Sequence, residues 1–387
     1  MGANDLDSLK ALRSFTATSA PITEAAIERF LAKQIEFEGS AVKVSFANET
    51  LNAGASGGTV LFQLDSPADS PRYADGLVLK YELGNASFFS QTSQRSQFEI
   101  LQALRGRGLP VPDAIWLDEA GEIAGAPAII MGRVRARAPS IQYMQAGPFV
   151  EADDAGRLTM LRRLLELGAR IHQVDAAGLE APSLATRGGE GQHFIDRQIN
   201  WALAEMHAKF PANEGGERAE LHAEIRTTIE DAAVWLRANA PRHRTPSLVH
   251  GDLTIANTMY GDDGSIVALL DWELAHLGLP ETDVAYLLYA MHSIAQLGTP
   301  IENLPSLDDV AEYYRDAGGE LPDWTFGRAM GAFCLMTWGA IGMRRMPREF
   351  WPVQRSMWRQ QSGMFLAAQA DFEADRQGSA GQIAAVQ

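Results

Sequence analysis

The pattern of apolar and polar positions divides the chain into a β-rich first third and a largely helical remainder. Between residues 42 and 83, runs such as VKVSF, TVLFQL and LVLKYEL alternate or are rich in β-branched residues, with glycine- and proline-containing turns between them. A helix is predicted over 91–105 from its apolar period, and two more strands are predicted near 114–117 and 128–134. These elements together predict an antiparallel sheet with one helix inserted between its strands.

The segment before the sheet and almost everything beyond residue 150 show helical periodicity. Residues 1 to about 40 are expected to be helical, with Thr23 as a cap. The apolar face of this first helix is formed by Ile27, Phe30, Leu31 and Ile35. Three longer helical segments are LTMLRRLLELGARIHQV, FIDRQINWALAEMHAKF and LHAEIRTTIEDAAVWLRAN. A large helical region therefore follows the sheet.

A short β-rich island interrupts the helical region. Strands are expected at 247–249, 258–260 and 267–271, and the helix VAYLLYAMHS follows them before a proline-rich loop. The last dozen residues, which end in GSAGQIAAVQ, are expected to form a loose tail. The predicted fold class is α+β, with a β-rich N-lobe and its helical extension over 1–131 and a larger helical C-lobe over 132–387.

Composition and charge narrow the class of protein. The 387 residues are 46% apolar and 21% charged, which is typical of a globular protein and excludes a disordered chain or a fibre. Asp and Glu number 49 against 33 Lys and Arg, so the formal net charge is -16 and nucleic acid is not expected as a partner. The single Cys334 excludes a disulfide framework and any multi-cysteine metal site.

No targeting or membrane segment is expected either. The opening MGANDLDSLK has no apolar core and is therefore not a secretory signal. The stretch Ala329–Met343 is uncharged but shorter than the roughly 20 residues that span a bilayer. We expect it to be a buried helix of a cytoplasmic protein without a membrane partner.

The densest polar cluster lies on the β island. His250, Gly251 and Asp252 follow an apolar run, Asn257 comes five residues after Asp252, and Asp271 ends a second apolar strand. The same spacing of His, Asp and Asn, followed by a later Asp, forms the catalytic loop and metal site of protein kinases. A carboxylate in that position can accept a hydroxyl proton, and amide and carboxylate oxygens are hard ligands that suit Mg²⁺.

This segment resembles the aminoglycoside phosphotransferase and choline kinase-like family, whose two-lobed fold is protein-kinase-like. Within it, LLDWELAHLGLPETDVAYLL is most similar to the acyl-CoA-dehydrogenase-associated phosphotransferase branch. The resemblance implies that Asp252 is the catalytic base and that Asn257 and Asp271 bind the metal. It also implies that His250 is part of the catalytic loop and orients it, and that Asp283 braces this loop.

The β-rich lobe is expected to supply a nucleotide clamp. A glycine-rich segment between two strands would let backbone N–H groups approach phosphates, and its candidate contacts are Gly54, Ser56, Gly57 and Gly58. A flexible hairpin is the alternative for this segment taken alone. Lys80, in the strand LVLKYE, resembles the family lysine that contacts the α- and β-phosphates.

The helix after this strand departs from the family pattern. The family usually has a glutamate that pairs with the lysine, and the corresponding position here is Gln97. Gln97 can hydrogen-bond the Lys80 ammonium as a nucleotide-site residue but forms no ion pair. Glu99 is the alternative partner if the helix is shifted locally. Without an ion pair Lys80 would be held more loosely, which would affect the affinity for the nucleotide.

The segment PAIIMGRV resembles the strand and hinge that link the two lobes of the family. Backbone groups near Met131 and Arg133 are expected to face the adenine. Arg133, Arg135 and Arg137 alternate after the hinge, which is typical of a solvated strand face; binding of an anion, such as a phosphate of a CoA-linked substrate, is the alternative. Nearer the motif, His172 is expected to be a packed core residue, and Glu273 either touches substrate or metal or lies exposed.

These residues together predict an ATP-dependent, Mg²⁺-dependent phosphotransferase that phosphorylates a hydroxyl of a small molecule, with its active cleft at the lobe junction. The family name suggests an aminoglycoside, whereas the branch suggests a hydroxy acid, a hydroxyacyl-CoA or a related alcohol, which we favour. A metal-dependent hydrolase and a non-catalytic nucleotide-binding regulatory module remain open, the latter because of Gln97. The acceptor pocket would be lined by 180–245 and 290–365, where the resemblance is weakest, and the oligomeric state is not predicted.

Overall fold

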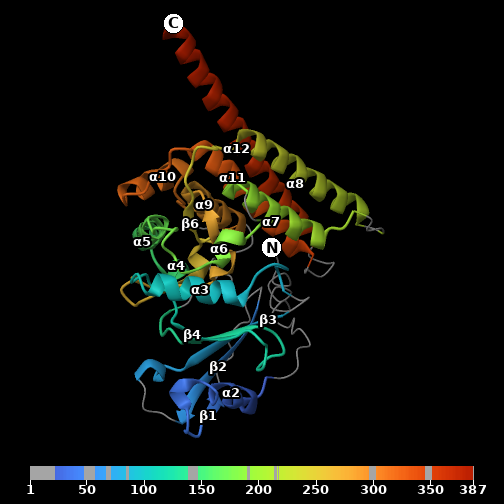
Figure 1. Ribbon diagram of the computed structural model, residues 1–387. Helices are drawn as coiled ribbons and strands as arrows, with labels where there is room; N and C mark the ends of the chain where they lie inside the picture. The colour runs from blue at the N-terminus through green and yellow to red at the C-terminus, as the bar shows by residue number, and fades with distance from the viewer. Residues whose placement is uncertain are drawn as a thin grey trace. The chain divides into compact units, whose positions relative to one another are not determined.

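The computed structural model describes residues 22–47, 57–66, 71–83, 87–137, 147–189, 192–212, 216, 218–295, 302–344 and 351–386. The chain forms two compact units, Met1–Arg135 and Ala136–Gln387 (Figure 1). The first is built on a sheet and the second on helices, so the predicted α+β class is confirmed.

The sheet of the first unit has five strands in the order β1-β2-β3-β5-β4, and every neighbouring pair is antiparallel. Its strands are β1 (Lys43–Phe46), β2 (Gly57–Ser66), β3 (Leu77–Glu82), β4 (Ala114–Asp118) and β5 (Ala128–Gly132). Lys80 lies in the central strand, opposite Thr59 of β2 and Ile129 of β5. The predicted antiparallel sheet is therefore confirmed.

Helix α2 (Glu24–Leu31) begins at the predicted cap, because the Thr23 side chain accepts a hydrogen bond from the Ala26 N–H at 3.2 Å. Its buried apolar face consists of Ile27, Phe30 and Leu31. The prediction that Ile35 shares this face is wrong, because the helix ends before it. Ile35 lies in the short 3-10 helix η2 (Ile35–Phe37) and is 85% exposed.

Two further elements complete the first unit. Helix α3 (Gln94–Arg105) packs against β4 and β5 and buries Leu101 and Leu104, as its apolar period predicts. The 3-10 helix η3 (Pro71–Tyr73) contributes to an aromatic cluster whose ring centroids lie 5.4 to 6.2 Å apart. The cluster consists of Phe37, Tyr73 and Trp116. It lies in the core that α2 and the sheet share.

The second unit is mainly helical. Its helices are α4 (Pro148–Glu151), α5 (Asp154–His172), α6 (Ser183–Thr186), α7 (Phe194–Lys209), α8 (Ala219–Asn239), α9 (Pro280–Ala295), α10 (Leu307–Asp316), α11 (Trp324–Met343) and α12 (Trp351–Val386). Helix α11 packs against α7, α8, α9 and α12 and is buried along almost its whole length, so the predicted buried helix is confirmed. Within the described part of the chain, no helix is both long and apolar enough to cross a membrane.

The β island consists of two separate two-stranded sheets. Strand β6 (Ser247–Val249) pairs with β9 (His276–Gly278), and β7 (Thr258–Tyr260) pairs with β8 (Ile266–Leu269), both antiparallel. Strand β9 is missed by the sequence pattern, because three residues, HLG, are too short to show an alternation. Its pairing with β6 places the segment after Asp271 beside the start of the HGD motif.

The C-terminal segment is not the loose tail that was predicted. Helix α12 continues to Val386. Alanine and glutamine are good helix formers, so the sequence QIAAV can extend a helix that has already been nucleated.

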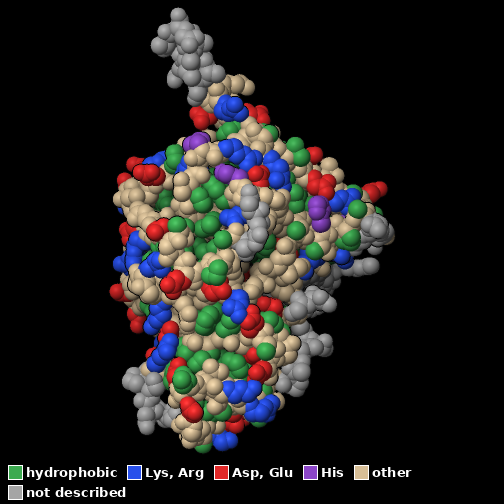
Figure 2. All heavy atoms as spheres, in the orientation of Figure 1, with side chains coloured by type: hydrophobic (Ala, Val, Ile, Leu, Met, Phe, Trp, Pro, Cys, Tyr) green, Lys and Arg blue, Asp and Glu red, His purple; other side chains and the backbone are tan. Residues whose placement is uncertain are grey.

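Charged side chains are mixed on the face of the molecule shown in Figure 2, where acidic and basic groups lie side by side. Ion pairs among the described residues include Arg72 with Asp113 at 2.8 Å. Among the side chains drawn on this face, no single large basic surface is seen, in keeping with the net charge of -16.

Candidate active site

The chain enters the HGD motif from β6 through a turn that requires glycine. Leu248 and Val249 of β6 are fully buried and anchor the start of the loop. Gly251 has a φ of +81°, and a Cβ at this position would lie 2.4 Å from the carbonyl oxygen of Leu274. A side chain at position 251 would therefore displace the loop that carries Asp252.

Asp283, in the first turn of α9, holds this loop by its backbone. Its Oδ2 accepts a hydrogen bond from the His250 N–H at 2.7 Å, and its Oδ1 accepts one from the Gly251 N–H at 2.9 Å. Oδ2 also accepts a hydrogen bond from His172 Nε2 at 3.0 Å, and His172 Nδ1 lies 2.7 Å from the Tyr314 hydroxyl. Burial alone would raise the pKa of Asp283, but the hydrogen bonds and charge of His172 and His250 hold it below its ordinary value. The expected bracing contact is present, and His172 is buried as predicted.

His250 is fully buried and shapes the loop from within. Its Nε2 donates to the Leu270 carbonyl at 2.9 Å, and its Nδ1 accepts the Asp252 backbone N–H at 3.2 Å. Burial lowers the pKa of His250 and so favours the neutral ring, which is the form with one donor and one acceptor. Both ring nitrogens are thus used by the protein itself, which is the orienting role that the family resemblance implies.

The Asp252 carboxylate lies beside an amide and a phenol. Asn257 Nδ2 donates to Asp252 Oδ2 at 2.8 Å and to the Asp252 carbonyl at 3.0 Å, and Tyr286 of α9 also hydrogen-bonds the carboxylate. Burial, and after it the charge of Asp271, raise the pKa of Asp252 to about 7 despite these hydrogen bonds. A carboxylate with a pKa near neutrality is well suited to take up a proton.

Asp271 follows β8 in a conformation that is uncommon for a residue with a side chain. Its φ is 63° and its ψ is 59°, in the left-handed region. Directly after it, Trp272 is almost fully buried, and its Nε1–H donates to the Leu269 carbonyl at 3.0 Å. This anchor stabilises the turn that brings the Asp271 charge near Asp252. Backbone strain of this kind tends to occur at functional sites.

The oxygens around Asp252 fit a magnesium ion. Because Asn257 turns its Nδ2 toward Asp252, its Oδ1 is the side-chain atom left for another ligand. The repulsion between Asp252 and Asp271, which contributes to the raised pKa, would be relieved by a divalent cation. Among the described residues, no group of three or more His, Cys, Asp or Glu is placed to hold a metal. Mg²⁺ commonly uses one or two protein groups and completes its shell with phosphates and water.

In the first unit, Lys80 and Gln97 lie together. Lys80 Nζ donates to Gln97 Oε1 at 3.2 Å, and Gln97 is 3% exposed. Glu99 lies 3.7 Å from Arg95, one helical turn earlier on α3. Gln97, one of the two partners considered for Lys80, therefore contacts it. Gln97 Nε2 is buried without a hydrogen-bond partner in the described part of the chain.

Only part of the glycine-rich segment can be placed. Gly54 and Ser56 lie outside the described residues, whereas Gly57 and Gly58 begin β2. A Cβ at Gly58 would lie 2.1 Å from the ring of Tyr81, and one at Gly57 would lie 3.0 Å from the Tyr81 carbonyl oxygen. Packing against β3 therefore explains these two glycines, and contact with phosphates stays a prediction.

The segment around Met131 and Arg133 is occupied largely by its own sheet. Met131 pairs with β3 and β4, and the Arg133 N–H donates to the Gly76 carbonyl at 3.0 Å. That N–H is therefore already used, which leaves carbonyl groups and other positions for the expected contact with adenine. Arg135 pairs with Asp75 at 2.7 Å and Arg137 pairs with Glu151, in agreement with a solvated face rather than a free anion site.

Two features of this region differ from, or go beyond, what the sequence predicts. Glu273 is 7% exposed, so the alternative of an exposed side chain is wrong, and its charge contributes to the raised pKa of Asp252. The contact of Tyr286 with Asp252 was not predicted. Its signal is the spacing of three residues from Asp283, which places the two side chains on one face of α9.

Comparison with known proteins places this geometry in a family. The sequence profile of the phosphotransferase enzyme family matches residues 75–329. Acyl-CoA dehydrogenase family member 10 of Mus musculus is 30% identical over 243 residues, which are 61% of this chain and 21% of that protein. The curated relatives are much longer than the chain, which spans between 21% and 34% of their lengths.

Solved structures share the fold. Plasmodium vivax ethanolamine kinase is 10% identical and superposes with a TM-score of 0.63 over 94% of this chain and 96% of its own. Spectinomycin phosphotransferase in complex with ADP and spectinomycin is 12% identical, with a TM-score of 0.52 over 90% of this chain and 99% of its own. At these identities the likeness shows the fold alone, which is the predicted protein-kinase-like phosphotransferase fold.

These findings confirm the predicted family, which is one of phosphotransferases, and its likeness to acyl-CoA-dehydrogenase-associated members. The HGD loop, Asn257 and Asp271 all lie within the matched residues, as does Lys80. The chain belongs to the phosphotransferase enzyme family.

Proposed function

We propose that the chain transfers the γ-phosphoryl group of ATP to a hydroxyl of a small molecule, with Asp252 as the base. The observation that carries the proposal is the Asp252 carboxylate, which is held by Asn257 and Tyr286 near Asp271 and has a pKa of about 7. The acceptor oxygen would form a bond to the γ-phosphorus while the bond to the β-phosphate oxygen breaks and ADP leaves. Asp252 would accept the hydroxyl proton, and most of the catalysis would come from positioning and charge.

In this proposal Asn257 and Asp271 would hold Mg²⁺, which when bound supplies positive charge against the phosphate oxygens. The Asp252 carboxylate keeps its orientation through Asn257 Nδ2, so the same amide would serve both the base and the ion. The brace from Asp283 fixes the loop on which both of them depend.

The nucleotide would be bound by the first lobe. Lys80, supported by Gln97, would contact the α- and β-phosphates, and the backbone near Met131 and Arg133 would contact the adenine. The glycine-rich segment would approach the phosphates through Gly54, Ser56, Gly57 and Gly58. We therefore assign nucleotide binding to residues 1–131 and acceptor binding with catalysis to residues 132–387. The ADP bound to spectinomycin phosphotransferase, which has the same fold, supports an adenine nucleotide.

For the acceptor we favour a hydroxy acid, a hydroxyacyl-CoA or a related alcohol over an aminoglycoside. The support is the similarity in sequence to acyl-CoA dehydrogenase family member 10, at 30% identity, which exceeds the identity to spectinomycin phosphotransferase. The chain covers a fifth of that relative, so the similarity bears on the phosphotransferase part alone.

The test is transfer of label from γ-labelled ATP, with Mg²⁺, to a set of alcohols that includes hydroxy acids, hydroxyacyl-CoA esters and aminoglycosides. Asp252→Asn preserves the shape of the side chain and is expected to lower turnover on the order of a hundredfold to ten-thousandfold, with ATP binding retained. Asp262→Asn, an exposed acid in the turn between β7 and β8, is the matched control and is expected to behave as wild type.

Three other results would contradict the proposal. Label that reaches only water would indicate the hydrolase, and ATP binding without any transfer would indicate the regulatory module. Wild-type turnover in Asp252→Asn would remove the assigned base.

A further inference from the structure

A small cavity lies in the second unit, beside the catalytic loop. Its lining includes Gly251, which precedes Asp252, and Leu274, together with Arg187, Arg197, Trp201 and His276. Its volume is about 20 Å³, which is room for one water-sized group. The cavity is therefore large enough for a single oxygen atom of a ligand head group.

Arg187 is held in one orientation by the segment that follows Asp271. Its Nη1 donates to the carbonyls of Glu273 at 2.9 Å and Ala275 at 2.8 Å, and its guanidinium carbon lies 4.1 Å from the ring centroid of Trp201. Arginine has five N–H donors, and the two on Nη1 are used by these carbonyls. In the described part of the chain, the donors on Nε and Nη2 make no hydrogen bond. The guanidinium is thus fixed with three donors left over.

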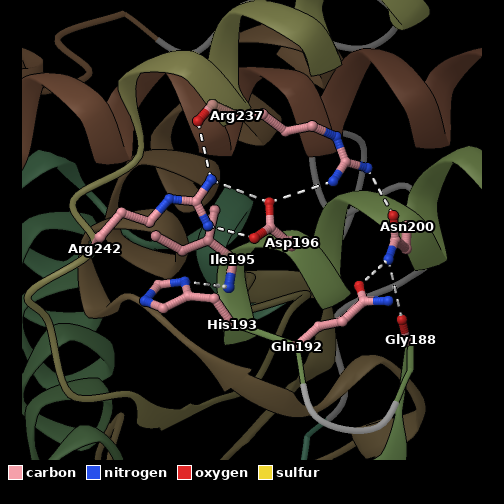
Figure 3. Close-up of polar contacts among 8 residues, drawn as sticks. All are labelled: Gly188, Gln192, His193, Ile195, Asp196, Asn200, Arg237 and Arg242. Carbon is pink, nitrogen blue, oxygen red and sulfur yellow. Dashed lines mark hydrogen bonds and ion pairs between the residues drawn. The ribbon is translucent and has the colours of Figure 1, made fainter.

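The loop that carries Arg187 is fastened to α7 and α8 by a polar network (Figure 3). Asn200 of α7 donates to the Gly188 carbonyl at 3.4 Å and to Gln192 Oε1 at 2.5 Å. Arg237 of α8 donates to Asn200 Oδ1 at 2.7 Å and to Asp196 at 3.3 Å. Because Gly188 is the next residue after Arg187, this network limits the movement of the arginine.

The charges that face the cavity are mainly positive. Arg197 also lines it, donates to the Ala185 carbonyl, and has its Nε buried without a partner among the described residues. Neither arginine forms an ion pair with a described carboxylate. Burial lowers the pKa of Arg187 to about 10 even though Glu273 and Glu205 act in the opposite direction. The local acids therefore do not fully offset the cost of burying this cation.

His276 does not add to this positive charge. Its Nδ1 donates to the Leu274 carbonyl at 2.8 Å, and burial together with Arg187 lowers its pKa to about 4. The ring is neutral near pH 7, and its Nε2 is buried without a partner in the described residues. The arginines are thus the charged groups of the cavity.

We propose that Arg187 selects the phosphoryl acceptor by binding an anionic group, a carboxylate or a phosphate, of the molecule whose hydroxyl reaches Asp252. This inference rests on the proposed function and narrows it to acceptors that carry both a hydroxyl and an oxyanion. Planar, fixed N–H donors match the oxygens of carboxylate and phosphate. A cationic acceptor such as an aminoglycoside would meet like charge at this wall. Gly251 lines the cavity and directly precedes Asp252, so an acceptor anchored here would have its hydroxyl near the proposed base.

The experiment compares acceptors of one chain length that differ only in the group opposite the hydroxyl. For chains of four to six carbons, the ω-hydroxy acid, the ω-hydroxyalkyl phosphate, the diol and the amino alcohol are assayed for ADP release by wild type, Arg187→Met and Arg187→Lys. A charge-assisted hydrogen bond contributes about 1.5–3 kcal/mol, so Arg187→Met is expected to lower kcat/KM about tenfold to a hundredfold for the anionic acceptors. The value for the diol should fall much less than the values for the anionic acceptors, and Arg187→Lys should restore part of the preference.

The matched control is Arg162→Met. Arg162 lies 4.1 Å over the Tyr313 ring, the same stacking distance as Arg187, but does not line the cavity. This variant should keep the wild-type preference. Preference of the acid over the alkyl phosphate, or the reverse, would show which oxyanion is bound.

Direct binding separates failure of this inference from failure of the proposed function. The same compounds are titrated into Asp252→Asn and into the double variant Asp252→Asn with Arg187→Met, and binding is measured by ligand-observed NMR. Anion binding that disappears with Arg187→Met supports the inference even if no acceptor is phosphorylated. Equal losses for the diol and the acid, stronger binding of the amino alcohol, or anion binding that persists in Arg187→Met would overturn it.

Discussion

Removal of the Asp283 carboxylate should disturb the conformation of the catalytic loop while it leaves the proposed reacting groups in place. Asp283 is 1% exposed and accepts hydrogen bonds from the His250 N–H, the Gly251 N–H and His172 Nε2. None of these contacts involves a reacting group. Substitutions at this position therefore test whether the loop that carries Asp252 depends on a buried acceptor.

The size of the effect follows from the number of donors left unpaired. Asp283→Ala leaves three donors without this acceptor, namely the backbone N–H groups of His250 and Gly251 and the ring of His172. The two backbone groups alone cost about 1–3 kcal/mol each, so unfolding should become at least about 2–6 kcal/mol easier. Asp283→Asn keeps one oxygen, which can serve His250 and His172, and turns an amide NH₂ toward Gly251. It should lose about half as much as Asp283→Ala.

Urea-induced unfolding measures these losses, and turnover with γ-labelled ATP measures the consequence for the loop. Both variants should lose turnover, Asp283→Ala more than Asp283→Asn, while their affinity for ATP stays close to that of wild type. The exposed Asp308→Asn serves as the control and should change the free energy of unfolding by less than about 0.5 kcal/mol. An Asp283→Ala variant that is no less stable than this control, or unaffected turnover in both variants, would rule out this role of the Asp283 carboxylate.

Three further predictions follow from single contacts. Gly251→Ala should lower thermal stability and abolish most turnover, because its Cβ would lie 2.4 Å from the Leu274 carbonyl oxygen at a φ of +81°; wild-type turnover would contradict this. Gln97→Leu removes the acceptor that lies 3.2 Å from Lys80 Nζ and should weaken ATP binding severalfold by calorimetry, with kcat nearly unchanged; an unaltered Kd would contradict it. The pKa of His276 is lowered from 6.5 to about 4, so the unfolded state binds its proton first and stability should fall by about 3 kcal/mol as the pH drops through that range. His276→Asn should show a smaller loss between pH 7 and pH 4 in urea unfolding, and an identical pH profile would count against the assignment.

The elements that the sequence predicts well are those with a strong local signal. The alternation in LVLKYEL predicts β3, and the cap at Thr23 predicts the start of α2, because both signals lie within the element itself. The errors occur where no local signal exists. Ile35 fits the period of a helix that has already ended, and β9 is only three residues long.

The candidate site divides in the same way. His250, Asp252 and Asn257 come from one loop, so their spacing in the sequence nearly determines their spacing in the structure. Asp271 joins them through a short hairpin, and its role can be inferred from the same motif. The contact of Lys80 with Gln97 required the structure, because Gln97 and Glu99 lie on the same helix and the sequence does not determine the orientation of α3.

The groups proposed to select the acceptor had no such signal. Arg187 donates to the Glu273 carbonyl, which lies 86 positions later in the sequence. Trp201, on which Arg187 stacks, lies on α7 and not near the catalytic loop in the sequence. An arginine in a polar stretch such as TRGGEG is typical of an exposed loop, and only burial and the fixed Nη1 contacts distinguish it. Phosphoryl transfer places the same demands on every member of a family, so its residues keep a compact motif, whereas an acceptor can be recognised by any surface that the fold brings near the base. For this chain, the candidate catalytic residues could therefore be located from a short segment, whereas the groups proposed to select the acceptor have to be derived from contacts between distant segments.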